Sequence, residues 1–200
     1  MKNMNKINGI TFQSKIRPVN REQFNKIIST YEKHHFVDYP WTVKESVLSN
    51  KAYTKGVFDC TVCGITDRTK VLLLHICPTM KANQDFSSII NFIKRTFDIK
   101  SPNMQGFLLG SKNLPYVGEK SLIMFDNFEK FFEQHKIPFS KIKGGRYAND
   151  VAYSCHTDEW IISHEKLANY SSRSSYKNPA NFIDMHYEEI KINELDELSW

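Results

Sequence analysis

Two apolar runs separated by a short polar stretch constrain this chain more than any other feature of its sequence. The runs cover residues 56–65 and 70–78, and Thr-Asp-Arg-Thr lies between them at 66–69. Polar stretches of this kind reverse the chain, so the pattern predicts an antiparallel hairpin. An even loop centred on this stretch places Cys60 directly opposite His75, on the same face and with Cβ atoms roughly 5 Å apart. A thiol beside an imidazole is the minimum that a cysteine nucleophile and its base require.

The composition predicts a globular chain and argues against several classes of function. Two hundred residues with fourteen Phe and nine Tyr suit one domain with a sizeable core. The net charge of +5 is modest, and no Lys/Arg-rich block is interleaved with aromatic residues, so no nucleic-acid partner is predicted. No apolar run is long enough for membrane insertion, and no apolar stretch typical of a secretory signal follows residues 1–6. The four Cys are compatible with reduced thiols in a cytosol.

Local patterns predict strands with helices between them along the chain. Asn20 is expected to cap a helix together with Gln23, in a capping box. Further helices are expected at 86–97, capped by Asp85, and at 121–135, where a phenylalanine stripe predicts a buried face. A strand is expected at 105–110, and a terminal antiparallel meander at 139–143, 150–155 and 159–163. We therefore expect an α+β fold with layered mixed or antiparallel β-sheets flanked by helices.

The sequence divides into three expected parts. Residues 1–46 form an N-terminal extension, with a polar lead-in to about residue 19 followed by one helix. Residues 47–165 contain the hairpin and the later helices and strands, and we expect them to form the main domain, to which the family resemblance described below assigns a cysteine hydrolase activity. Residues 166–200 are rich in Ser and Asn and then acidic, which predicts a partly ordered tail.

A zinc site is the main alternative use of the same residues. Cys60 and Cys63 have the spacing of half a zinc knuckle, and His75 with Cys77 could complete four ligands. Side chains alternate along a strand, however, so Cys63 is expected to point to the face opposite Cys60 and His75. We therefore do not predict a metal site, and the chemistry of a cysteine nucleophile with a histidine base needs no organic cofactor. A redox role for the Cys-x-x-Cys pair is not predicted either, because no helix begins there.

A set of motifs between residues 47 and 163 occurs in an order that resembles a known family. Thr54 lies six residues before Cys60, and Asp67 lies seven residues after it. The remaining matches are Lys70-Val71 opening the strand that carries His75 and ends at Pro78, the strand Phe107-Leu108-Leu109-Gly110, the segment His135-Lys136-Ile137, and Gly144-Gly145-Arg146 followed by Tyr153. Together they resemble the bacterial chemoreceptor glutamine deamidases, the CheD family. Phe58-Asp59, a shorter Cys-to-His loop and Gly110-Ser111 depart from the family pattern.

The resemblance implies a CheD-like fold and a Cys-His-Thr triad that converts Gln side chains of a target protein to Glu. Cys60 is then the nucleophile, His75 the base and Thr54 the residue that orients the imidazole. We expect the backbone N–H groups of Asp59 and Cys60 to hold the oxyanion. A straight strand of six residues spans roughly 20 Å, so Thr54 reaches His75 only if the chain bends near Gly56.

The resemblance also implies partners and a location. The substrate is a protein with a reactive Gln, a regulatory protein partner is expected, and the reaction takes place in the bacterial cytoplasm. Deamidating bacterial toxins of the cytotoxic necrotizing type share this fold, and the acidic C-terminal residues resemble type IV secretion signals, which implies translocation into a host cell as a second setting. Two other functions stay open on the residues alone. One is a different thiol hydrolase, a protease or a transglutaminase, and the other is a catalytically degenerate binding or adaptor module.

Overall fold

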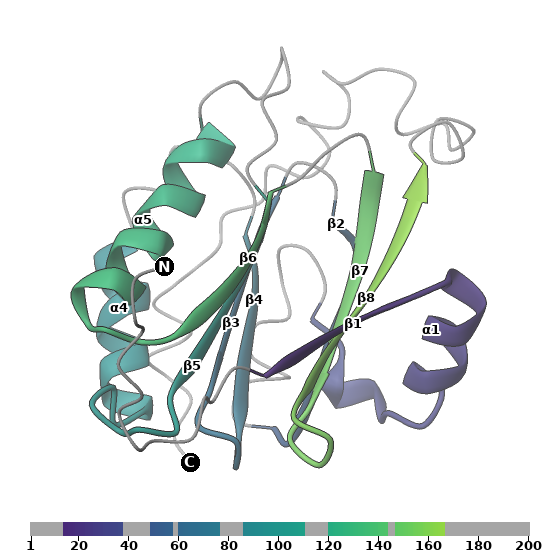
Figure 1. The fold of residues 1–200 in the computed structure, drawn as a ribbon, viewed down its shortest axis with the longest axis horizontal. Helices are drawn as coiled ribbons and strands as arrows, with labels where there is room; N and C mark the ends of the chain where they lie inside the picture. The colour runs from purple at the N-terminus through teal and green to yellow at the C-terminus, as the bar shows by residue number, and fades with distance from the viewer. Residues whose placement is uncertain are drawn as a thin grey trace, which may run out of the picture.

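The computed structural model has an α+β fold in which two mixed four-stranded sheets pack face to face between helices (Figure 1). It describes residues 14–37, 49–57, 60–76, 86–110, 120–143 and 147–166. Helices α4 and α5 cover the outer face of one sheet, and α1 covers the outer face of the other. The expected layered α+β architecture is therefore confirmed. Among the described residues, no helix is long and apolar enough to cross a membrane.

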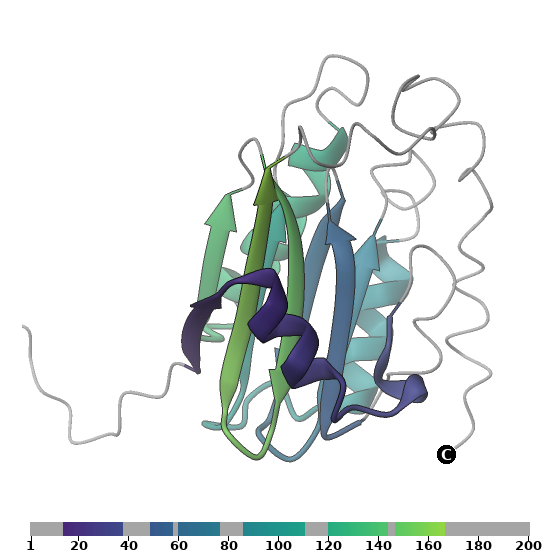
Figure 2. The same cartoon turned by 90° about the vertical axis from the view of Figure 1, so that its right-hand side faces the viewer.

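The first sheet contains β1, β8, β7 and β2 in that order. Its strands are β1 (Lys15–Val19), β2 (Lys51–Val57), β7 (Tyr147–Ser154) and β8 (Glu159–Lys166). Strand β7 pairs antiparallel with both β2 and β8, and β1 pairs parallel with β8. Helix α1 (Arg21–Ile28) packs on the outer face of this sheet through Phe24, which is fully buried against Ala152 and Ile161. Figure 2 shows α1 lying across the strands.

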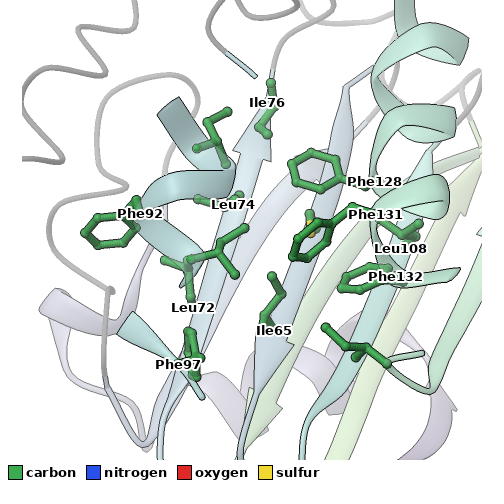
Figure 3. Packing of buried hydrophobic residues seen from close by; sticks show 14 of the residues in the cluster. Ile65, Leu72, Leu74, Ile76, Phe92, Phe97, Leu108, Phe128, Phe131 and Phe132 are labelled. Atoms are coloured by element: carbon green, nitrogen blue, oxygen red, sulfur yellow. The ribbon is translucent and has the colours of Figure 1, made fainter. Parts of the chain in front are cut away.

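The second sheet contains β4, β3, β5 and β6 in that order. Its strands are β3 (Thr61–Thr66), β4 (Val71–Ile76), β5 (Gln105–Gly110) and β6 (Phe139–Lys143). Strand β3 pairs antiparallel with β4 and β5, and β5 pairs parallel with β6. Helices α4 (Phe86–Thr96) and α5 (Lys120–Gln134) lie on its outer face, over a core rich in phenylalanine (Figure 3).

The faces of the second sheet separate two cores, and this separation determines where the chemistry can occur. Ile65, Leu72 and Leu74 point toward the helices (Figure 3). Cys63 belongs to the same buried cluster. The alternate residues of the same strands, such as Val62 and Leu73, point toward the first sheet, together with Cys60. This second core, between the two sheets, is called the intersheet layer below.

The hairpin of β3 and β4 is confirmed, but its predicted register is wrong. Val62, not Cys60, lies directly opposite His75, because the loop begins one residue later than expected. The Asp67 carboxylate accepts hydrogen bonds from the backbone N–H groups of Thr69 at 2.9 Å and Lys70 at 3.0 Å. Asp67 therefore starts the turn, and Thr66 before it stays in the ladder opposite Val71.

The expected continuous run over residues 56–65 is also wrong. Strand β2 ends at Val57 in the first sheet, and β3 begins at Thr61 in the second. The chain thus crosses from one sheet to the other, and Cys60 lies at the end of that crossing. An unbroken apolar run does not distinguish one strand from two strands joined by a crossing, since both are buried.

The terminal meander is only partly present. β7 and β8 form an antiparallel hairpin, but β6 belongs to the other sheet and pairs parallel with β5. A parallel pair needs a long crossover, and α5 supplies it between β5 and β6. The expected turn at Gly144-Gly145 and the expected cap at Asp85 lie outside the described residues.

The N-terminal segment is joined to the first sheet. The capping box is confirmed, because the Gln23 N–H donates to the Asn20 side chain at 2.8 Å and the Asn20 N–H donates to that of Gln23 at 3.2 Å. The polar lead-in that was expected up to residue 19 contains strand β1, which the sequence did not predict. Pro18 and the basic residues of β1 hide its alternation, and Pro is tolerated because β1 is an edge strand. Of the expected C-terminal tail, residues 167–200 lie outside the described part.

Candidate active site

Thr54 and His75 meet in the intersheet layer. Thr54 lies on β2 of the first sheet, and His75 lies on β4 of the second. The Thr54 Oγ1 and His75 Nδ1 atoms are 2.7 Å apart, which is a hydrogen bond between side chains from different sheets. Thr54 is fully buried and His75 is 2 % exposed. The contact therefore forms away from bulk water, where a hydrogen bond holds a side chain firmly in one orientation.

Cys60 lies beside this pair in the same layer. It precedes β3 by one residue and belongs to the intersheet cluster that contains Val62. Val62 is directly opposite His75, and Cys60 lies two residues before Val62, one residue outside the paired ladder, in a position diagonal to His75. Diagonal neighbours lie within reach of long and aromatic side chains. The structure thus brings the three predicted residues to one layer, with a one-step change in register.

A bulge in β2 solves the problem of reach that the sequence poses for Thr54. Thr54 pairs with Val151, but Val57 pairs with Asn149, so two residues of β2 lie opposite Asp150. Gly56 is one of the two and has a φ of +68°, in the left-handed region that glycine adopts without strain. The expected bend near Gly56 is therefore confirmed. It lets Thr54 point into the intersheet layer while the chain behind it leaves for the second sheet.

Burial controls the protonation of His75. Desolvation lowers the pKa of the imidazole from 6.5 to about 3, because the charged ring loses its hydration. His75 is therefore neutral at physiological pH, which is the state in which a ring nitrogen can accept a proton. When Nδ1 carries the ring proton, it donates to the Thr54 hydroxyl and leaves a lone pair on Nε2.

This protonation predicts a specific acid sensitivity. The unfolded chain protonates His75 near pH 6.5 and the folded chain only near pH 3, so the folded state loses stability as the pH falls through that window. Going from pH 7 to about pH 5 should lower the unfolding free energy by up to about 2 kcal/mol through this one residue. Urea denaturation of wild type and His75→Gln at both values measures it. The stability difference between the two proteins should change by this amount, and parallel behaviour would contradict the assignment.

Gly110 fixes the backbone beneath Cys60. It ends β5 with a φ of +149°, and a Cβ atom placed on it would lie 2.9 Å from the Cys60 carbonyl oxygen. That distance is closer than a side-chain carbon tolerates, so only glycine lets β5 approach the Cys60 backbone this closely. Asp59, the other expected oxyanion residue, lies outside the described residues.

The other thiols of the described chain lie in different surroundings. Cys63 is buried on the helix-facing side, as its alternation with Cys60 predicts, and desolvation raises its pKa well above the usual value. Cys155 is half-buried, and desolvation raises its pKa to about 11. A thiol with so high a pKa is almost entirely protonated at neutral pH and reacts slowly. Cys77 lies outside the described residues.

The three described residues of the zinc alternative, Cys60, Cys63 and His75, do not all come together. Cys63 is separated from Cys60 and His75 by the sheet itself, because the two cysteines belong to cores on opposite faces. Within the described residues, no group of three or more His, Cys, Asp or Glu is placed to hold a metal ion.

Asp150 contacts the backbone of the bulge next to Thr54, and the sequence did not predict this contact. Asp150 is 4 % exposed, and its carboxylate accepts the Gly56 N–H at 2.9 Å, at the bulge itself. A glycine inside a strand run is a signal for a bulge, but nothing in the sequence pairs it with a residue ninety-four positions later.

Comparison with known proteins identified no related protein. No protein-family model matches the sequence, and no curated protein matches it.

Proposed function

We propose that this protein is a cysteine-dependent protein-glutamine deamidase in which Cys60, His75 and Thr54 form the catalytic triad. The observation that carries the proposal is the 2.7 Å hydrogen bond between Thr54 Oγ1 and His75 Nδ1. It orients the second ring nitrogen of a neutral histidine within one buried layer that also contains a thiol. A nucleophile, a base and a residue that orients the base are the three parts of such a triad.

The reaction follows from these roles. Nε2 of His75 takes the Cys60 thiol proton as the sulfur attacks the side-chain carboxamide carbon of the substrate Gln. His75 then gives that proton to the departing nitrogen, the C–N bond breaks, and ammonia leaves a thioester. His75 next takes a proton from water, the resulting hydroxide displaces the sulfur, and the thiol is restored. Water and Gln become Glu and ammonia, and backbone N–H groups near Cys60 stabilise the oxyanion at each step.

Burial sets the order of these proton transfers. A ring with a pKa of about 3 does not hold a proton in the resting site, so His75 rests as a neutral imidazole. Proton transfer therefore accompanies attack on the substrate instead of preceding it. The steps require neither a metal nor an organic cofactor.

The CheD resemblance supports the same reading. That family implies a Cys-His-Thr triad on the same three positions, a substrate protein with a reactive Gln and a regulatory protein partner. The layered α+β sheets are compatible with a CheD-like fold. The bacterial cytoplasm is the proposed setting, and translocation into a host cell is the second.

The test compares wild type, Cys60→Ala and a matched Cys155→Ala control, each incubated with a bacterial and with a mammalian proteome. We expect ammonia release and Gln-to-Glu conversions of about one dalton with wild type and Cys155→Ala, and neither with Cys60→Ala. Cleaved chains would assign a protease and crosslinks a transglutaminase. A biological effect that persists in Cys60→Ala would assign a binding module.

A further inference from the structure

The bulge after Thr54 is held by a side chain from a different strand. Gly56 donates its N–H to the carboxylate of Asp150 on β7 at 2.9 Å. In the regular part of the ladder, strand N–H groups bond to the carbonyls of the partner strand. At Gly56 a side chain accepts the N–H that the bulge turns away from the ladder.

The carboxylate lies on the far side of the sheet from the triad. Val151 and Tyr153 of β7 point into the intersheet layer, whereas Ala152 points to the outer face, under α1. By alternation, Asp150 shares the outer face with Ala152. Asp150 is nevertheless only 4 % exposed. Burying a carboxylate is costly unless donors satisfy it, so a donor such as the Gly56 N–H is needed at this position.

The bulge determines how Thr54 and Cys60 lie relative to each other. Thr54 is the last residue of β2 in regular register, and Cys60 follows after the crossing to the second sheet. Without the bulge, β2 would continue along the first sheet and carry Cys60 away from His75, since each strand residue advances the chain by roughly 3.3 Å.

We propose that Asp150 is a positioning residue of the active site, which acts through Gly56 to hold the Thr54 hydroxyl against His75 and to direct Cys60 toward it. The effect on catalysis rests on the proposed function. The structural effect does not depend on a substrate: loss of the Asp150 acceptor releases the Gly56 N–H and loosens the contact between Thr54 and His75.

The experiment uses the full chain and four proteins: wild type, Asp150→Ala, Asp150→Asn and Ser163→Ala. Asn keeps a side-chain oxygen that can accept the Gly56 N–H, so Asp150→Asn is the conservative rescue. Ser163 lies directly opposite Asp150 on β8, is 1 % exposed, and has no hydrogen-bond partner for its hydroxyl within the described structure. Ser163→Ala therefore changes the same buried face without touching the Gly56 contact.

Three measurements are made on each protein. Hydrogen exchange of the Gly56 amide reports the bond itself, the ¹⁵N shifts of His75 report its contact with Thr54, and iodoacetamide reports the reactivity of Cys60. In Asp150→Ala we expect the Gly56 amide to exchange at least about tenfold faster, the His75 shifts to move, and Cys60 alkylation to fall about tenfold. Asp150→Asn and Ser163→Ala should resemble wild type in all three.

Unchanged His75 shifts in an Asp150→Ala protein with fast Gly56 exchange would overturn the inference, because the bond would then be lost without effect on the site. If Asp150→Ala does not fold, Asp150→Glu displaces the acceptor by one methylene and is judged by the same measurements. The first two use no substrate and no thiol chemistry. Failure of the deamidation assay with positive exchange and shift results would therefore reject the proposed function and leave the positioning role intact.

Discussion

Replacing His75 by Gln is expected to lower the deamidation rate by about 10³-fold, because the variant keeps a polar side chain in the intersheet layer but has no base to take the Cys60 proton. Alkylation of Cys60 by iodoacetamide at neutral pH should slow in parallel, and it can be measured before any substrate is known. Cys155 serves as the internal reference, since its pKa of about 11 keeps it slow in both proteins. Equal alkylation of Cys60 in wild type and variant would count against a catalytic role for His75.

Thr54 provides the matched pair of controls for this result. Thr54→Ser keeps a hydroxyl that can bond His75 Nδ1, whereas Thr54→Val has a similar shape without the hydroxyl. We expect Ser to retain most of the Cys60 reactivity and Val to lose about tenfold or more of it, since an unoriented imidazole is a poorer base. If Val and Ser behave alike, the hydrogen bond serves packing and not catalysis.

Replacing Gly64 by Ala should destabilise the fold by about 3 kcal/mol or more, which is at the upper end of the usual cost of overpacking. A Cβ atom on Gly64 would lie 2.1 Å from the Cη2 atom of Trp160. Trp160 is 1 % exposed and stacks on Phe107, with ring centroids 4.5 Å apart, so the indole has no room to withdraw. Urea denaturation at neutral pH measures the loss.

A double-mutant cycle identifies the clash as the cause. Trp160→Phe removes the ring that Gly64→Ala strikes, at the cost of a cavity of its own. The double variant should therefore be more stable than the sum of the two single effects predicts, by at least about 1 kcal/mol. Strict additivity would show that the contact with Trp160 is not the cause of the lost stability.

The sequence predicts the hairpin and the face that Cys60 and His75 share, because alternation and turn chemistry are local properties. It misses the register by one step, since two residues compete to begin the turn and only the contacts of the Asp67 carboxylate decide between them. The contact of Thr54 with His75 joins strands of different sheets, and no local pattern states which sheet a strand enters. The family resemblance supplied Thr54 where spacing did not.

The pairing of the outer strands shows the same limit. Strand β6 looks like the start of a meander with β7, but α5 returns the chain to the far side of β5 and makes β6 a parallel edge strand. Strand β1 has only five residues, one of them Pro, and gains its order from β8 at the other end of the described chain. Each of these two strands pairs with the free edge of a sheet. Which edge is free depends on the assembled fold and not on the local sequence.

The order in which the strands pair has a consequence for synthesis on the ribosome. Thr54 is held by β2, and β2 is aligned by β7, whose first residue is Tyr147. A nascent chain that already contains Cys60 and His75 thus still lacks β7, the partner strand that positions Thr54. The contact between Thr54 and His75 can therefore form only after β7 has emerged, so it belongs to the late stages of folding.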